Sequence, residues 1–147
     1  YELESMALVD SFRFESKEGW GMTHDEKHLI MGDGTNLLTY IDPVTYKPVK
    51  KIQVYDDKES VLFLNELEYS EGYIYANIYT TNLIAKIDPA TGKVLAKIDL
   101  DGILTMSNPD KPIDVLNGIA IDPVTKKMYV TGKFYPKLFV IKPVKKG

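Results

Sequence analysis

The sequence predicts an all-β fold, a β-propeller of four-stranded antiparallel blades, and three observations indicate it. The run Asp42-Pro43-Val44-Thr45 recurs as Asp88-Pro89-Ala90-Thr91, 46 residues later. The pair Leu64-Asn65 recurs as Leu116-Asn117 after 52 residues. Side chains alternate with the period of a strand, as in 73–79, and no segment shows a helical face. Four short strands in a repeat of about 46 residues are typical of a propeller blade.

Each repeat supplies its strands in order, separated by turn residues. In the first unit we expect strands at 20–24, 28–33, 37–42 and 49–54. In the second unit we expect strands at 65–69, 73–79, 83–88 and 94–100. The third unit carries three expected strands, at 117–121, 128–133 and 138–142. The blade units are therefore expected at about 18–54, 64–100 and 116–143, with residues 1–17 as the tail of a preceding blade.

The chain of 147 residues holds about three blades and is treated as one partial domain, 1–147, whereas closed propellers have about four to eight blades. The extra length of the third repeat falls in 101–114, whose Pro, Asp, Asn and Ser residues indicate an inserted loop. An open set of blades leaves unpaired strand edges and an uncovered apolar flank. We therefore expect a piece of a larger propeller, closed by a complementing N-terminal segment or by self-association.

Composition excludes several classes of protein. With 44% apolar and 27% charged residues, the chain is expected to be globular. A net charge of −3 with dispersed Lys and Arg gives no nucleic-acid surface, and no apolar run approaches the ~20 residues of a membrane span. The absence of Cys excludes disulfides and a Cys nucleophile but leaves the compartment undecided. Residues 1–4 show neither the basic nor the apolar region of a signal peptide.

Blade topology brings polar and aromatic residues together at one end of the fold, which we call the rim. In an up-and-down sheet, the start of the first strand and the end of the second lie at the same end. The residues at these positions are Trp20, Asn65, Asn117, Asp33, Tyr79, Asn82, Lys133 and Tyr135. Aromatic walls can hold an alkyl, amide or amine group, Asn both donates and accepts, and Lys stabilises negative charge. The rim is therefore the predicted binding site.

Simpler interpretations of the rim residues stay open. Trp20 is the only Trp and could belong to the core. Asn65 and Asn117 could bond loop backbone, as Asn often does. Lys133 could be solvated, and Tyr79 could be a packing residue of a strand.

Other titratable residues give weaker patterns. Glu66 and Glu68 lie two apart on one strand, so they could do acid–base work or form a hydrogen-bonded pair. His24 and His28 lie in a strand–turn–strand segment, where their spacing does not indicate a metal pair. Neither a metal nor another cofactor is expected.

At these same residues the sequence resembles the plant and bacterial type of glutaminyl-peptide cyclotransferase, or glutaminyl cyclase. The resembling stretches run in order across the chain, at 18–22, 64–69, 76–79, 114–120 and 130–139. The resemblance implies a five-bladed β-propeller that converts the N-terminal glutamine of peptides to pyroglutamate with loss of ammonia. It also implies a peptide or protein substrate and a secretory or periplasmic route.

The resemblance also implies roles for the rim residues. Trp20 would be a wall of the substrate pocket, and Asn65 would bond the substrate amide or α-amine. Lys133 would be the polar group opposite. Tyr79 and Tyr135 stand where the family usually has tryptophans, which keeps an aromatic wall but alters its size. With Asn117, these residues form the predicted set, in which Asn65 and Lys133 carry the chemistry.

One part of the family pattern has no counterpart here. No stretch matches the Phe-x-Gln motif of the family, a further tryptophan, or the glutamate proposed as general acid–base. We therefore expect the full-length enzyme to be active and this chain alone to be weak or inactive. The alternative function is a non-catalytic propeller that uses the same rim as a binding scaffold.

Overall fold

The computed structural model describes residues 1–57, 59–104 and 112–145, and within them it contains strands and no helix. The first sheet has the order β1-β2-β3-β4, with bounds Met22–His24, Leu29–Gly32, Leu37–Ile41 and Pro48–Gln53. The second has the order β7-β8-β9-β10, with bounds Leu64–Ser70, Tyr73–Ile78, Leu83–Ile87 and Val94–Asp99. The third joins β11, β12 and β13, at Leu116–Ile121, Met128–Gly132 and Phe139–Ile141. All neighbouring strands in these sheets are antiparallel.

The eleven expected strands are confirmed, and their ends differ by at most two residues from the expected ones. A hairpin of β5 (Tyr55–Asp56) and β6 (Glu59–Ser60) was not expected, because two-residue strands show no alternation. Residues 1–21 contain no strand, so the assignment of 1–17 to a preceding blade stays a prediction. Of the expected inserted loop, residues 105–111 lie outside the described part of the chain.

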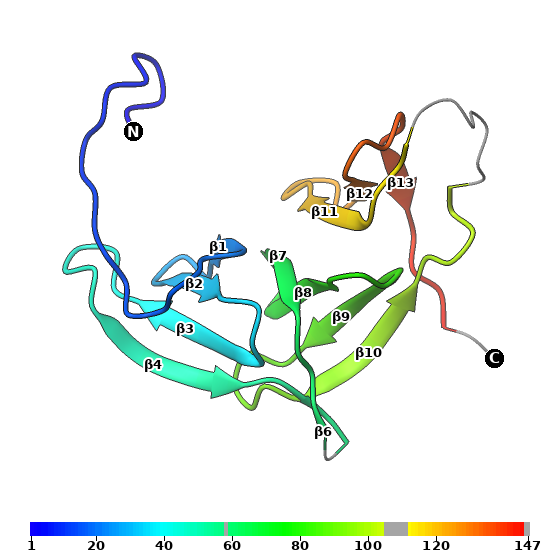
Figure 1. The fold of residues 1–147 in the computed structure, drawn as a ribbon, viewed down its shortest axis with the longest axis horizontal. Helices are drawn as coiled ribbons and strands as arrows, with labels where there is room; N and C mark the ends of the chain where they lie inside the picture. Colours follow the sequence, from blue (N-terminus) through cyan, green and yellow to red (C-terminus); the bar gives the residue numbers. More distant parts are fainter. Residues whose placement is uncertain (58, 105–111, 146–147) are drawn as a thin grey trace.

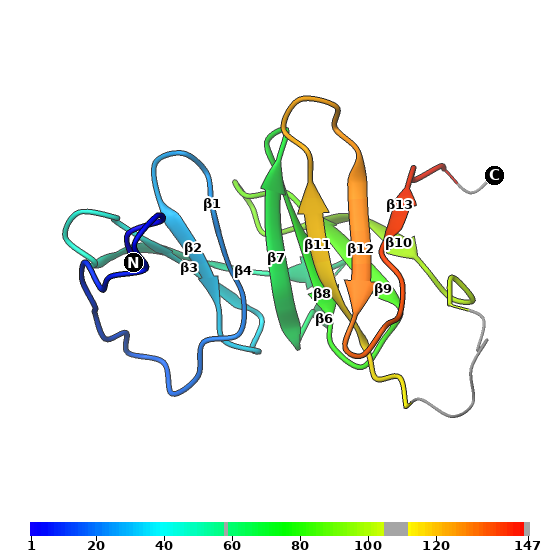
Figure 2. The same ribbon diagram turned by 90° about the horizontal axis from the view of Figure 1, so that it is seen from above.

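The three sheets are arranged as successive blades. Their first strands lie side by side, with β7 between β1 and β11 (Figure 2). The fourth strands β4 and β10 run along the periphery (Figure 1). The connection from β4 to β7, including the β5–β6 hairpin, therefore crosses from the periphery to the inner strands. This arrangement is that of a propeller segment.

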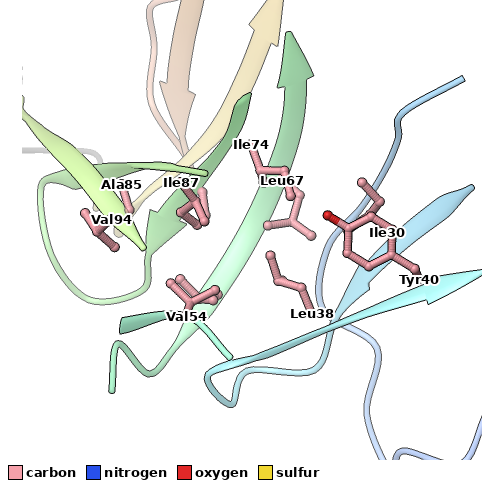
Figure 3. Packing of buried hydrophobic residues seen from close by; sticks show 11 residues of the cluster. Ile30, Leu38, Tyr40, Val54, Leu67, Ile74, Ala85, Ile87 and Val94 are labelled. Carbon is pink, nitrogen blue, oxygen red and sulfur yellow. The ribbon is translucent and has the colours of Figure 1, made fainter. Parts of the chain in front are cut away.

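Two clusters of buried side chains join the blades. The first lies between the first and second sheets and includes Leu38, Val54, Leu67 and Ile74, all at most 1% exposed (Figure 3). The second lies between the second and third sheets and is centred on Ile84, Leu116 and Val130. Alternate side chains of β8, Ile74 and Ala76, belong to the first cluster, as the period of two of a strand predicts.

Three Asp-Pro turns, which begin at Asp42, Asp88 and Asp122, lie at the end of the blades opposite the rim. They join β3 to β4, β9 to β10 and β11 to β12. In the first and third, one Asp oxygen accepts two successive backbone N–H groups, as Asp42 Oδ1 does from Val44 and Thr45 at 3.0 and 2.7 Å. These bonds lower the pKa of Asp42, most strongly through Thr45. The repeated turn is therefore a local device that reverses the chain.

Candidate functional site

The candidate site is a cluster of three side chains from three blades at the rim. Trp20 precedes β1, Tyr79 follows β8 and Lys133 follows β12. The rings of Trp20 and Tyr79 meet edge to face, with centroids 5.5 Å apart and planes at 74°. The Nζ of Lys133 lies 4.9 Å from the centroid of the Tyr79 ring. The structure thus brings together one predicted residue from each blade.

The indole of Trp20 is fixed by its immediate surroundings. Its Nε1 donates a hydrogen bond of 2.6 Å to Oε2 of Glu18, and its backbone N–H donates to the carbonyl of Gly32 at 2.9 Å. The ring lies on Gly34, where a Cβ would come within 2.6 Å of the indole and where φ is +81°. Only glycine meets both conditions easily, since it has no side chain and adopts positive φ without strain. Gly34 therefore forms the support on which the indole lies.

A short series of backbone bonds connects this support to Tyr79. The N–H of Phe63 donates to the carbonyl of Gly34 at 2.8 Å. The carbonyl of Phe63 accepts the N–H of Tyr79, also at 2.8 Å. Phe63 thus fixes the relative height of Trp20 and Tyr79, although sequence reasoning did not select it.

Asn65 and Asn117 occupy equivalent places at the starts of two inner strands. The pairing of β7 with β8 shifts between Leu64 and Leu67, and that of β11 with β12 shifts between Leu116 and Ile119. Each shift leaves one extra residue in the inner strand, which is a β-bulge. Bulges redirect side chains and are frequent beside functional sites. The two carboxamides are therefore presented by a repeated irregularity rather than by regular strands.

The two carboxamides have different surroundings. Oδ1 of Asn117 accepts the backbone N–H of Glu66 at 3.4 Å, which joins the second and third blades. The half-buried side chain of Asn65 forms no hydrogen bond within the described part of the chain. Its backbone carbonyl approaches Gly21 so closely that a Cβ there would lie 2.0 Å away. Asn117 thus has a structural contact, whereas the Asn65 carboxamide is available to a ligand.

Tyr135 packs beside the cluster. Its ring lies over Gly132, where a Cβ would come within 2.6 Å of Cε1, and it covers the second core cluster. Burial raises the pKa of its phenol. Its contacts are thus core contacts, and its part in substrate binding stays a prediction.

Sequence reasoning missed Asn77, the most buried polar residue of the rim region. Asn77 in β8 is 0% exposed, and its Oδ1 accepts the N–H of Gly118 at 3.1 Å. Its Nδ2 has no partner among the described residues. The bond holds the bulge that presents Asn117. The available signal was Asn77 itself, because it is the one amide in the alternation of Tyr73, Tyr75 and Tyr79.

The two glutamates of β7 differ in their contacts. Oε1 of Glu68 accepts the N–H of Ile121 at 2.9 Å, so this carboxylate joins the second and third blades. Burial, and then the negative charge of Glu68, raise the pKa of Glu66. Glu66 therefore keeps its proton to higher pH than an exposed glutamate does.

His28 lies against Asp25, with Nδ1 3.2 Å from Oδ1, in the turn from β1 to β2 at the end opposite the rim. Among the residues that the structure describes, no group of three or more His, Asp or Glu side chains is placed to hold a metal ion. In that same part of the chain, no helix is long and apolar enough to cross a membrane.

Comparisons with known proteins agree with this arrangement. The model of the glutamine cyclotransferase family matches residues 1–143. A glutaminyl-peptide cyclotransferase of Arabidopsis thaliana is 39% identical over 144 residues, which cover 97% of this chain and 45% of that protein. The crystal structure of Myxococcus xanthus glutaminyl cyclase superimposes with a TM-score of 0.75 at 38% identity, covering 86% of this chain and 56% of that one.

A more distant likeness concerns the fold alone. Hydrazine synthase of Kuenenia stuttgartiensis superimposes with a TM-score of 0.59 at 15% identity, over 92% of this chain and 35% of that one. The chain spans about half the length of the two nearer relatives described above. The extent of the family match and the identity to the Arabidopsis protein place the sequence without ambiguity. The chain belongs to the glutamine cyclotransferase family.

Proposed function

We propose that this chain is part of a glutaminyl-peptide cyclotransferase, which converts the N-terminal glutamine of a peptide to pyroglutamate and releases ammonia. The observation that carries the proposal is the meeting of Trp20, Tyr79 and Lys133 from three blades. Asn65 lies near the start of the inner strand β7, and its carboxamide has no hydrogen-bond partner among the described residues. The names of the two nearer relatives support the same reaction.

In this reaction the neutral α-amine attacks the carbon of the γ-carboxamide. A bond forms between these two atoms, the bond from that carbon to the amide nitrogen breaks, and a proton passes from the amine to the departing nitrogen. Ring closure requires a folded substrate, so a group that holds the substrate folded lowers the entropic barrier. The Trp20–Tyr79 pair provides apolar walls for this purpose. Tyr135 and Asn117 would extend the wall and its polar edge.

The carbonyl oxygen gains negative charge as the amine attacks. A donor aimed at that oxygen stabilises the transition state more than the ground state. We assign this role to Nδ2 of Asn65, with the ammonium of Lys133 as the opposing charge. We assign proton transfer to a carboxylate in the N-terminal part of the enzyme, as the family resemblance implies.

The test uses a peptide that begins with glutamine, with ammonia release and pyroglutamate as readouts. The proteins are this chain alone, and a longer protein in which the family's N-terminal part precedes it. We expect turnover by the longer protein and little or none by the chain alone. No turnover by the longer protein would refute the proposed reaction, and peptide binding by the longer protein without ammonia release would favour the scaffold function.

Single substitutions in the longer protein test the assigned roles. Asn65→Ala is expected to lower kcat by about 10²–10³-fold, the usual effect of removing one oxyanion donor. Lys133→Ala is also expected to lower kcat. The matched control is Lys137→Ala, which replaces an exposed lysine four residues further on and should leave kcat unchanged. An unchanged kcat in Asn65→Ala would remove that residue from the chemistry.

The three sheets form an open set of blades rather than a closed ring, so the edges of the set are available to a partner. We propose that the ring is completed by a complementing N-terminal segment or, failing that, by a second copy of this chain. The mass of the chain in solution, with and without an added N-terminal half, distinguishes the two. If the chain has the mass of a monomer both alone and after the N-terminal half is added, both forms of the proposal are contradicted.

A further inference from the structure

An open groove of about 850 Å³ lies beside the candidate site, between the connection from β4 to β7 and the second sheet. Its floor is apolar and consists of Val61, Leu62, Phe63, Ile78 and Leu83. Its outer edge carries carboxylates, at Asp56, Asp57 and Glu59. A surface with an apolar floor and an acidic edge suits an extended peptide with both apolar and basic side chains.

The groove adjoins the rim cluster through two of its lining residues. Phe63 lies at its inner end and accepts the backbone N–H of Tyr79. Ile78 in the floor directly precedes Tyr79. A chain whose first residue lies against Trp20 and Tyr79 can therefore continue directly into the groove.

The walls of the groove are held in place by specific contacts. Ser60 Oγ accepts a hydrogen bond of 3.1 Å from Nδ2 of Asn36, and Asp56 pairs with Lys97 at 2.5 Å. The Asp56 charge is thereby neutralised, whereas Asp57 and Glu59 form no ion pair within the described residues. Lys58 stands between Asp57 and Glu59 in the sequence, so three carboxylates and two lysines, counting Lys97, leave the edge with a net charge of −1.

The apolar residues at the inner end are exposed. Leu62 is 47% and Phe63 is 53% exposed, and they are adjacent in the chain. Phe63 also has a φ of +63°, an uncommon conformation for a bulky residue, held by its two backbone bonds to Gly34 and Tyr79. Such outliers persist where the surroundings enforce them, and they cluster at binding sites. A ligand that covers this exposed apolar area removes it from water, which lowers the free energy of the complex.

We propose that this groove binds the residues that follow the N-terminal glutamine of a peptide substrate. Apolar side chains of the peptide cover Leu62 and Phe63, and a Lys or Arg further along lies near Asp57 and Glu59. The inference rests on the proposed function, because it assumes that the glutamine occupies the Trp20–Tyr79 cluster. It adds a preference of the enzyme for peptides with apolar and then basic residues after the glutamine.

The test measures binding to this chain through the fluorescence of Trp20, its only tryptophan. The probes are glutamine amide, the peptide Gln-Leu-Leu-Lys amide, and the same peptide ending in Glu. The lysine peptide is expected to bind about tenfold or more tightly than glutamine amide, since a tenfold change corresponds to about 1.4 kcal/mol. It is also expected to bind more tightly than the peptide that ends in Glu.

Two variants test the groove itself. Leu62→Ser combined with Phe63→Asn, a residue that tolerates positive φ, should reduce the affinity for the lysine peptide to that for glutamine amide. Asp57→Asn combined with Glu59→Gln should abolish the preference for Lys over Glu. Leu138→Ser and Glu71→Gln, both exposed and outside the groove, are the controls. Peptide binding that is absent, or unchanged in both groove variants, would overturn the inference.

A peptide that begins with alanine separates this inference from the proposed function. If Ala-Leu-Leu-Lys amide binds as tightly as the glutamine peptide and the groove variants weaken both, the groove binds peptides but the assumption of a glutamine site is wrong. If only glutamine peptides bind and the groove variants have no effect, the glutamine site stands and the groove is not part of it.

Discussion

The two interfaces between blades are built differently, although the same repeat produces both. The interface of the first and second sheets buries eleven clustered residues. At the inner strands one side chain crosses it, because Thr23 accepts the N–H of Tyr69 at 3.0 Å. From β3 and β4, Tyr40 and Lys50 also reach across to the carbonyl of Pro89, each at 3.4 Å. Among the described residues, the interface of the second and third sheets buries six, and three side chains cross it, from Asn77, Asn117 and Glu68. The first interface thus buries more apolar residues, and the second has more hydrogen bonds at its inner strands.

This difference matters for the candidate site because Lys133 lies on the third sheet and Tyr79 on the second. Apolar contacts are non-directional, whereas each hydrogen bond requires one donor to meet one acceptor at a defined distance. The bonds to Glu66, Gly118 and Ile121 therefore fix the height of the third sheet against the second. We infer that the first interface contributes more to stability and the second more to the geometry of the site.

The largest expected effect compares one leucine in each interface. Leu64 and Leu116 hold equivalent places at the starts of β7 and β11 and are 0% and 1% exposed. Replacing a buried Leu by Ala costs about 2–5 kcal/mol, with more lost where the surroundings cannot collapse. We expect Leu64→Ala to lower the free energy of unfolding more than Leu116→Ala does, as measured by urea denaturation. The reverse order would contradict the comparison.

Asn77→Ala tests the polar interface at its most buried point. The substitution leaves the N–H of Gly118 without its acceptor, and an unsatisfied buried group costs about 1–3 kcal/mol. We therefore expect a loss of that size in urea denaturation. The matched control is Asn82→Ala, an exposed residue five positions on that bonds Asp101, where a change within about 0.5 kcal/mol is expected. If both substitutions lower the free energy of unfolding equally, the buried bond of Asn77 contributes no more to stability than the exposed bond of Asn82.

The fold followed from the sequence because its signals are local. Asp42, Asp88 and Asp122 each accept bonds from residues two or three positions ahead, so the turns that separate the strands can be recognised without knowledge of the rest of the chain. The meeting of Trp20, Tyr79 and Lys133 also followed, because strand order alone decides which strand ends share a rim.

The missed features depend on neighbours that are distant in sequence. Asn77 is buried only because β11 lies beside β8, and its partner Gly118 is 41 residues away. The β5–β6 hairpin and Phe63 are held by Gly92 and Gly34, and no local pattern marks these contacts. Long-range packing of this kind cannot be derived from alternation or turn chemistry.

Thr23 and Glu68 allow the two interfaces to be compared, since each side chain accepts a backbone N–H of the next blade. An ordinary hydrogen bond contributes about 0.5–1.5 kcal/mol, and one to a charged group about 1.5–3. We expect Glu68→Ala to lower the free energy of unfolding by about 1–2 kcal/mol and Thr23→Ala by about 1. Glu68→Gln keeps the acceptor and should recover most of the loss. If Glu68→Gln is as unstable as Glu68→Ala, the charge rather than the bond stabilises the interface.

The smallest expected effect is a pH dependence at Glu66, beside the polar interface. Its pKa is raised in the folded protein by burial and by Glu68, so the unfolded chain loses this proton at lower pH than the folded one. The protein therefore loses stability as pH rises from the ordinary glutamate pKa through the raised one, and the loss persists above it. Glu66→Gln removes this penalty but keeps the backbone bond to Asn117.

Urea denaturation at a series of pH values compares Glu66→Gln with the unchanged protein. The two should have nearly equal stability below about pH 4, where the carboxyl is protonated in both states. Above about pH 4 the Glu66→Gln variant should become the more stable of the two. In a Glu68→Gln background, the difference in their free energies of unfolding should be smaller because the neighbouring negative charge is gone. If the two stability profiles are parallel at all pH values, Glu66 ionises in the folded protein as an exposed glutamate does. The polar interface between the second and third sheets would then not include the start of β7.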